Sequence, residues 1–245
     1  MEYKKNGFEK PYHPLQVVSW VVMSLHSVMP GICIYLFFCI QAKIALLVVF
    51  YTALGLVTVL GFLATNSNPT AVYFNCQSKS QVSLVFCSLC RKFVSESAKH
   101  CGQCKRCVDN FDHHCKWVNN CIGGKNYKLF IALIVCLETY LALNFGIEVV
   151  TLSGHVENEY AYTFIVADCV LGGCLLLLNG YLIVLHTWLW KKGLTTYQYI
   201  MVLRMRNGMI TPQSSSFSES SPRSESSECK KSVEASKKSY EEVHT

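Results

Sequence analysis

The chain has 245 residues, of which 51% are hydrophobic. Its mean hydropathy of +0.26 is high for a soluble protein, so membrane-spanning segments are expected. The formal charge of +6 fits anionic headgroups or a polyphosphate ligand, but fits equally the Lys and Arg bias of cytosolic membrane loops. Seven of the 14 cysteines fall between Cys87 and Cys121, interleaved with histidines. This pattern argues against a disulfide scaffold and favours metal binding in a reducing compartment.

The first two membrane helices are predicted to form a hairpin after a short N-terminal segment, residues 1–16. Residues 17–40 are mostly apolar, and a helix of that length spans roughly 36 Å, enough to cross a hydrocarbon layer of about 30 Å. The Pro30-Gly31 pair is expected to kink this helix, as membrane helices tolerate. A second apolar run covers residues 44–64. Because the first run is too long for a signal-peptide core, we interpret residues 17–64 as a transmembrane hairpin.

A second transmembrane hairpin is predicted over residues 129–190, with helices at 129–150 and 162–190. Four spans place both chain termini on the same side of the membrane. The stretch between the hairpins, residues 65–128, is rich in Lys and Arg, whereas residues 151–161 contain neither. The positive-inside rule therefore places the termini and the cysteine-rich segment in the cytosol.

The remaining residues, 191–245, are predicted to be a cytosolic tail. From about residue 211 the tail consists largely of Ser, Glu and Lys with few apolar residues, a composition that predicts disorder. We expect no internal repeat beyond the two membrane hairpins.

The cysteine-rich segment contains ten candidate metal ligands. Paired C-x2-C units suit tetrahedral zinc, and two closed four-coordinate sites would use eight of the ten ligands. One thiol and one imidazole would then remain, a pair in which the imidazole can deprotonate the thiol for nucleophilic catalysis. Since His114 and Cys115 are adjacent, spacing alone leaves open which of them faces a metal. The motifs are Cys87-x2-Cys90, His100-Cys101-x2-Cys104-x2-Cys107, Asp112-His113-His114-Cys115 and Cys121.

This run of motifs resembles the cysteine-rich domain of DHHC-type protein palmitoyltransferases. The order of spans also matches, so the resemblance covers roughly residues 6–200. It implies an α-helical membrane protein with four transmembrane helices and a cytosolic zinc-binding cysteine-rich domain between helices 2 and 3. The matching residues are Cys87, Cys90, His100, Cys101, Cys104, Cys107, Asp112 to Cys115, Trp117, Asn120, Cys121 and Gly123.

The family's ligand pattern implies two structural Zn²⁺ ions. It also implies that Cys115 is the acylated nucleophile and His113 its general base. Asp112 could orient the His113 ring and stabilise the imidazolium. The first ion would be held by Cys87, Cys90, His100 and Cys107, and the second by Cys101, Cys104, His114 and Cys121.

The resemblance further implies a protein S-acyltransferase that moves a long-chain acyl group from acyl-CoA (palmitoyl-CoA) to substrate cysteines. We expect cytosolic or membrane-associated protein substrates with membrane-proximal cysteines, contact with the lipid bilayer, and no nucleic-acid partner. The expected location is the endomembrane system, in the ER or Golgi, as a multi-pass protein. The alternative is a membrane scaffold that keeps the zinc-binding fold without efficient transfer.

Three departures from the family pattern bear on that alternative. Asn68-Pro69-Thr70 stands where the family often has Asp-Pro-Gly, and Gln198 replaces the carboxylate of a Thr-Thr-x-Glu motif. The segment Ser95 to Lys99 replaces a usual Lys-Pro-x-Arg. All three lie outside the predicted metal and catalytic residues.

Several side chains inside the predicted spans are also of interest. Tyr140 lies roughly 16 Å along the third span and could close the far end of an acyl cavity. Ordinary packing and a lipid-facing position are the alternatives. Glu138 and Asp168 are ionisable groups within spans, for which function is the default hypothesis, although Asp168 could be hydrated near the lumenal end.

Overall fold

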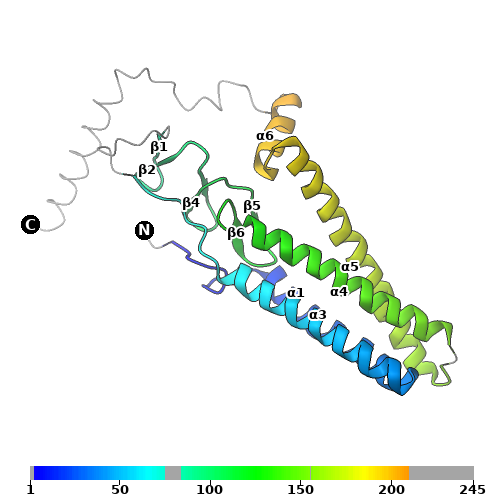
Figure 1. Ribbon diagram of the computed structural model, residues 1–245. Helices are drawn as coiled ribbons and strands as arrows, with labels where there is room; N and C mark the ends of the chain where they lie inside the picture. Colours follow the sequence, from blue (N-terminus) through cyan, green and yellow to red (C-terminus); the bar gives the residue numbers. More distant parts are fainter. Residues whose placement is uncertain (1–2, 75–83, 155, 210–245) are drawn as a thin grey trace, which may run out of the picture.

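The computed structural model describes residues 3–74, 84–154 and 156–209, so the tail predicted to be disordered lies outside the described residues. Four helical spans within the described part are long and apolar enough to cross a membrane. Figure 1 shows them as an elongated bundle that carries the cysteine-rich segment and the short helix α6 at one end. The predicted fold class is confirmed: four membrane helices with a potential zinc-binding segment between the second and third.

The first span is divided into two helices, α1 (Pro14–His26) and α2 (Val28–Phe37), where a single kinked helix was predicted. Proline has no N–H, so Pro30 cannot donate to the carbonyl of His26 four residues earlier. The helix is interrupted at Ser27. Pro30 itself lies in the first turn of α2, where a missing N–H is tolerated. The helix is therefore interrupted three residues before the proline.

The other three spans are continuous helices, each slightly longer than predicted. They are α3 (Ile40–Asn66), α4 (Tyr127–Ser153) and α5 (Glu159–Lys192). Helix α5 ends at Gly193, whose φ of +64° is left-handed and favours glycine. This turn allows the chain to reverse into α6 (Thr196–Arg206), which lies beside the cysteine-rich segment.

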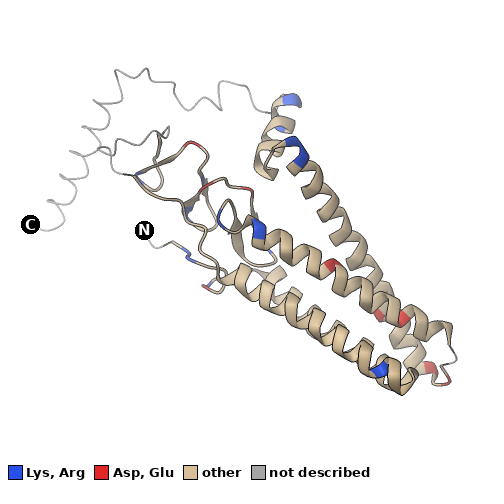
Figure 2. Ribbon diagram, viewed as in Figure 1, with Lys and Arg blue, Asp and Glu red and all other residues tan. Residues whose placement is uncertain are grey.

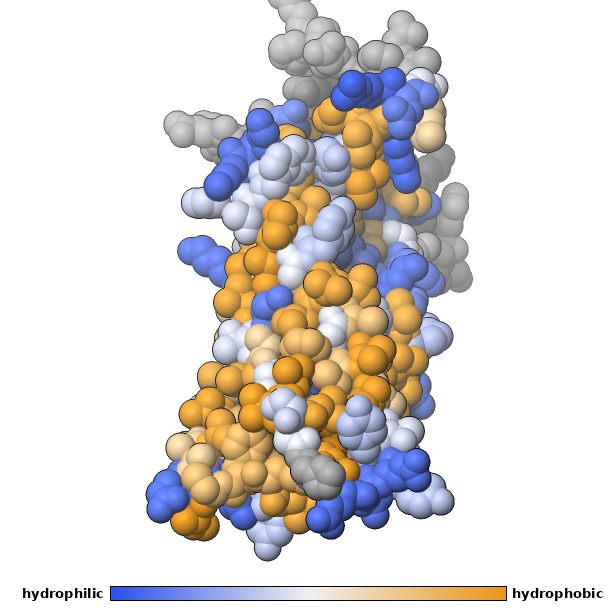
Figure 3. Space-filling model, turned by 90° about the vertical axis from the view of Figure 1, so that its right-hand side faces the viewer, coloured by the Kyte–Doolittle hydropathy of each residue, from blue (hydrophilic) through white to orange (hydrophobic). Residues whose placement is uncertain are grey.

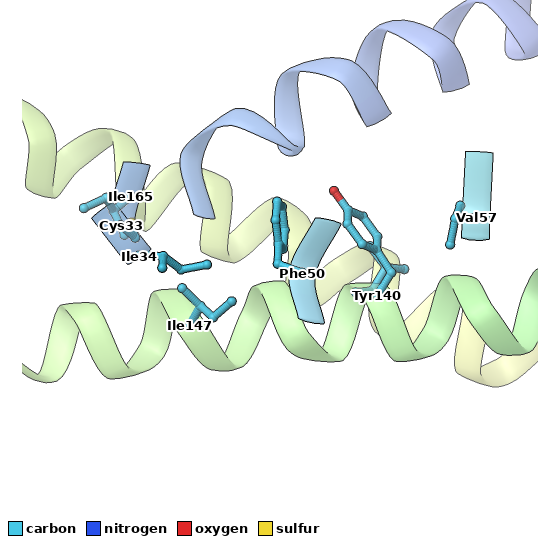
Figure 4. Packing of buried hydrophobic residues seen from close by; sticks show 8 residues of the cluster. Cys33, Ile34, Phe50, Val57, Tyr140, Ile147 and Ile165 are labelled. Carbon is cyan, nitrogen blue, oxygen red and sulfur yellow. The ribbon is translucent and has the colours of Figure 1, made fainter. Parts of the chain in front are cut away.

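An apolar cluster packs between α2, α3, α4 and α5, and it includes Ile34, Phe50, Ile147 and Ile165 (Figure 4). Tyr140 on α4 is fully buried in this cluster, and its ring centroid lies 5.7 Å from that of Phe50. Tyr140 therefore faces the bundle interior, and the lipid-facing alternative is wrong. Figure 3 shows hydrophobic residues over much of one outer face of the bundle, as contact with lipid tails requires.

The cysteine-rich segment forms three antiparallel two-stranded hairpins with strands of three or four residues. Such short hairpins bury little apolar surface and need other interactions to hold them. Their strands are β1 (Leu84–Cys87), β2 (Lys92–Ser95), β3 (Lys99–Cys101), β4 (Arg106–Val108), β5 (His113–Cys115) and β6 (Asn120–Ile122).

Buried polar side chains attach the hairpins to the end of α3. Arg106 is fully buried, and its Nη1 donates to the carbonyl of Lys5 at 2.7 Å and to Asn68 Oδ1 at 3.0 Å. Its Nη2 donates to Asn120 Oδ1 at 2.7 Å. The amide of Asn120 in turn donates to three carbonyls at and just beyond the end of α3. The exposed carbonyls of a helix end need such donors, and here they fix the third hairpin against the bundle.

Charge is distributed unevenly along the molecule. Figure 2 shows Lys and Arg mainly at the end of the bundle that carries the hairpins and α6, whereas acidic residues occur in the hairpin segment as well as in α4 and α5. The positive-inside rule associates this asymmetry with a cytosolic hairpin domain, and the orientation stays a prediction.

Candidate active site and metal centres

The three hairpins repeat one structural unit at an interval of 14 residues. Cys87, Cys101 and Cys115 each end the first strand of a hairpin. The residue four positions after each cysteine has a left-handed backbone that reverses the chain. These residues are Arg91 (φ 52°), Lys105 (φ 53°) and Asn119 (φ 50°). The expectation of no repeat beyond the membrane hairpins is therefore wrong.

The first hairpin contributes two thiols that face a histidine and a cysteine of the second. The Nδ1 atom of His100 lies 3.8 Å from Cys87 Sγ, 3.2 Å from Cys90 Sγ and 3.9 Å from Cys107 Sγ. Tetrahedral zinc, with ordinary Zn–S and Zn–N bonds, would separate such donors by about 3.6 Å. These four side chains therefore fit one metal ion.

The second hairpin repeats the arrangement with the third. The Nδ1 atom of His114 lies 3.7 Å from Cys101 Sγ, 3.3 Å from Cys104 Sγ and 3.8 Å from Cys121 Sγ. This set also fits one metal ion. The structure thus brings together both predicted ligand sets, and it places His114 in the second of them.

Cys115 begins the same turn in the third hairpin but belongs to neither ligand set. Val118 stands where the first two hairpins have Cys90 and Cys104, and the chain enters α4 instead of forming a fourth hairpin. The Cys115 side chain is buried against Phe130, Ile134 and other apolar residues at the end of the bundle. Of the two neighbours between which spacing could not choose, His114 is thus the one that lies among the potential ligands, and Cys115 is not.

Asp112 and His113 form a hydrogen-bonded pair next to Cys115. His113 Nδ1 lies 2.7 Å from Asp112 Oδ2. Asp112 is buried, and Thr196 at the start of α6 donates to it twice: its N–H to Oδ1 at 2.8 Å and its hydroxyl to Oδ2 at 2.9 Å. Helix α6 therefore holds the carboxylate that orients the His113 ring.

These contacts shift the pKa values of both groups. Burial alone would raise the pKa of Asp112, but the hydrogen bonds from His113 and Thr196 outweigh burial and lower it. Burial would lower the pKa of His113, but Asp112 and the neighbouring Cys115 outweigh burial and raise it to about 9. The pair thus favours a carboxylate beside an imidazolium, the state that forms when His113 takes up a proton.

Thr196, His186 and Tyr127 were not among the predicted site residues. His186 on α5 is buried, and its ring centroid lies 6.0 Å from that of His113. Its Nδ1 is 3.1 Å from the hydroxyl of Tyr127. An ionisable side chain inside an apolar span was the available signal for His186. Thr196 and Tyr127 carry no such signal in the sequence.

The order of these motifs matches a known family. Residues 80–202, half of the chain, match the sequence profile described as DHHC palmitoyltransferase. The chain belongs to this family. It is 38% identical over 159 residues to "Probable protein S-acyltransferase 19" of Arabidopsis thaliana, and the match covers 54% of this chain and 22% of that protein. It is 33% identical over 244 residues to human "Palmitoyltransferase ZDHHC1", and the match covers 81% of this chain and 50% of that protein. The chain thus spans half or less of the length of these relatives.

Two departures from the DHHC family pattern make defined contacts in this structure. Gln198 completes a capping box with Thr195: the Gln198 backbone N–H donates to the Thr195 hydroxyl, and the Gln198 side-chain Oε1 accepts from the Thr195 backbone N–H. Glutamine serves this motif as glutamate does. Asn68 Oδ1 accepts from Arg106 and twice from Thr70. The Asn68 amide oxygen therefore accepts a hydrogen bond from Arg106, but position 68 gives this cation no carboxylate partner.

The third departure lines a cavity of about 600 Å³ between the hairpins and α6. Ser95 in this segment donates to Asp109 Oδ1 at 2.7 Å, which ties β2 to the turn after β4. The lining includes neither Cys115 nor His113. The segment that replaces Lys-Pro-x-Arg therefore borders a cavity that Cys115 and His113 do not line.

Proposed function

We propose that this DHHC family member is a protein S-acyltransferase that moves a long-chain acyl group, palmitoyl foremost, from acyl-CoA to protein cysteines through a thioester at Cys115. The observation that carries the proposal is the position of Cys115. Of the seven cysteines between residues 87 and 121, all described, it alone belongs to neither metal-ligand set. It lies beside the hydrogen-bonded pair of His113 and Asp112.

The proton path follows from which nitrogen of His113 is engaged. Nδ1 is held by Asp112, so Nε2 is the nitrogen that accepts the Cys115 thiol proton. The thiolate attacks the acyl-CoA thioester, the acyl–sulfur bond to CoA breaks, and CoA leaves as a thiol with the proton from His113. A substrate thiol then gives its proton to His113, takes the acyl group, and Cys115 leaves and is reprotonated. One thioester replaces another, and a placed general base contributes about 10²–10⁴-fold.

We assign one structural Zn²⁺ to each set of three cysteines and one histidine. When bound, zinc supplies the folding energy that hairpins with little buried apolar surface lack. Asp112, His113 and Cys115 are placed by the third hairpin, whose His114 and Cys121 belong to the second set. The metal sites thus position the reactive residues and take no part in proton transfer.

The surroundings of Cys115 support a fatty acyl donor. Its neighbours Ala64, Phe130 and Ile134 lie at the end of the bundle, so an acyl chain on the sulfur can enter between the spans while CoA stays in water. Burying a methylene stabilises by roughly 0.8 kcal/mol, although much of this is already realised in lipid, so binding between the spans would mainly select chain length. Substrate cysteines must then approach near the membrane surface. The Lys and Arg distribution supports a cytosolic site, and we place the protein in the ER or Golgi.

A labelling experiment tests the transferase. Purified full-length protein is incubated with an alkyne analogue of palmitoyl-CoA, and we expect hydroxylamine-sensitive labelling of the wild type that Cys115→Ser abolishes. The matched control is Cys174→Ser, because Cys174 is an exposed thiol on α5 outside both ligand sets, and this variant should keep the label. Transfer of the label to a cysteine-containing acceptor protein should depend on Cys115 as well. A folded wild type that takes up no label would favour the scaffold instead.

A further inference from the structure

Three ionisable side chains meet inside the helical bundle, roughly 30 Å along α4 from its end at the hairpins. His26 is the last residue of α1, Glu148 lies on α4, and Asp168 lies on α5. Their candidate donor atoms all lie within 4.8 Å of one another. His26 Nδ1 is 2.9 Å from Asp168 Oδ1. Three helices thus bring one imidazole and two carboxylates to a single point.

These groups are deeply buried and poorly satisfied. His26 and Glu148 are fully buried. Within the described residues, no hydrogen-bond partner reaches either carboxylate oxygen of Glu148, the second oxygen of Asp168, or Nε2 of His26. Leaving such groups unpaired in an apolar bundle is costly, and ionisable groups in membrane spans therefore point to a bound charge or a function. The His26 contact can satisfy one carboxylate, but it leaves the other without a counter-charge.

The donor set itself indicates which counter-charge fits. An imidazole nitrogen with carboxylate oxygens is a typical ligand set for zinc and related divalent transition metals. Calcium and magnesium prefer six or more oxygen ligands and disfavour the imidazole. Donors about 2.1 Å from a metal lie about 3.0 Å apart in octahedral and about 3.4 Å apart in tetrahedral geometry, so the 2.9 Å between His26 Nδ1 and Asp168 Oδ1 is close to the octahedral separation.

We propose that His26, Glu148 and Asp168 bind one divalent transition-metal ion of the Zn²⁺ class inside the membrane bundle. The site is separate from the two cysteine–histidine sets, and it does not depend on the proposed transferase activity.

The local packing is shaped around the imidazole. A Cβ atom at Gly172 on α5 would come within 2.8 Å of His26 Cε1 and 3.2 Å of Nε2, so the absent side chain leaves room for the ring. With Nε2 against Gly172, Nδ1 is the nitrogen aimed at Asp168. The Asp168 side chain is 15% exposed, so the cluster lies close to the outer surface of the bundle. A bound ion would tie the end of α1, next to the break at Ser27, to α4 and α5.

Metal counting tests the site on full-length protein in detergent. The protein is purified in buffer that contains Zn²⁺, freed of unbound metal, and its zinc content is measured per chain. We expect three equivalents for the wild type, two from the cysteine sets and one from this site. His26→Asn and Glu148→Gln should each lose one equivalent. The matched control is Glu138→Gln, the same change on the same helix, because Glu138 bonds to Asn179 outside the cluster.

Two results would overturn the site: a wild type that binds no zinc beyond its cysteine sets, or His26→Asn and Glu148→Gln variants that keep the full wild-type count. Loading with Co²⁺ decides the matter without any variant, because cysteine sites give thiolate-to-metal charge-transfer absorption and this site cannot. The third Co²⁺ equivalent must therefore add only the weak d–d absorption of a cobalt ion with nitrogen and oxygen ligands. A third equivalent that adds thiolate charge-transfer absorption would refute the assignment. If the cysteine sets bind no metal, the zinc assignment under the proposed function fails. The difference in zinc content between the wild type and the His26→Asn and Glu148→Gln variants would still test the site in the bundle.

Discussion

Replacing Asn68 by aspartate should stabilise the junction between the hairpins and α3. Asn68 Oδ1 already accepts hydrogen bonds from Arg106 Nη1 at 3.0 Å, Thr70 N at 3.2 Å and Thr70 Oγ1 at 2.6 Å. A carboxylate can accept all three, and Arg106 is fully buried. The substitution therefore converts a neutral acceptor beside a buried cation into a charged one.

The size of the effect follows from this geometry. Two unit charges 3.0 Å apart attract with about 5–6 kcal/mol at an effective dielectric constant of 20. Partial desolvation of the new carboxylate opposes this attraction, and hydrogen bonds to charged groups exceed neutral ones by about 1 kcal/mol net. Because Asn68 is solvent-exposed, we expect a net gain of about 1 kcal/mol. For a chain of this size that corresponds to a rise in Tm of about 2–4 °C.

The assay is thermal unfolding of the purified protein in detergent, followed at one fixed scan rate because unfolding of membrane proteins is often irreversible. Asn66→Asp is the matched control. It adds the same charge two residues away, where the side chain bonds only weakly to Asn6, at 3.4 Å. The reasoning is refuted if Asn68→Asp leaves Tm unchanged or lowers it, or if Asn66→Asp raises Tm equally. High salt should reduce the gain only modestly, since Arg106 is buried.

Three further variants test the site and the bundle. Thr196→Val removes the hydroxyl that donates to Asp112 but keeps the N–H contact. Acylation of Cys115 should then slow about tenfold, because one charge-assisted hydrogen bond is lost. An unchanged single-turnover rate of acylation would contradict this role of Thr196. Gln198→Glu keeps the capping box and places a negative charge in the first turn of α6, so activity should stay within about twofold of the wild type; a large loss would show that the amide is required. Tyr140→Ala should broaden the preference among acyl-CoA chain lengths. It should also lower Tm by several degrees, because a buried aromatic ring is lost. A lower Tm with an unchanged length preference would show that Tyr140 only contributes to packing.

Much of the architecture was predictable because its causes are local. Long apolar runs have to become membrane helices, since the bilayer leaves no other way to satisfy the backbone. Closely spaced thiols and imidazoles likewise indicate metal sites before any fold is known. The sequence predicts that the first span is irregular, because Pro30 cannot donate a backbone hydrogen bond. It does not predict that the break lies at Ser27, which depends on how α1 and α2 pack.

Other features depend on residues far apart in the sequence. Thr196 reaches Asp112 only because Gly193 turns the chain back towards the hairpins. The contact between His26 and Asp168 joins residues 142 positions apart in the sequence, and no local pattern around either residue indicates the other. Single-sequence patterns record periodicity and spacing, so contacts across helices stay outside their reach.

The sequence by itself determined the four spans, the ten clustered ligands and the count that leaves one thiol and one imidazole free. The three-dimensional structure adds the observation that Cys115 is the thiol outside both potential ligand sets. Cys115 and His114 are neighbours along a strand, and successive side chains of a strand point to opposite faces. His114 therefore turns towards Cys101 and Cys104, while Cys115 turns away from both metal sets and packs at the end of the bundle.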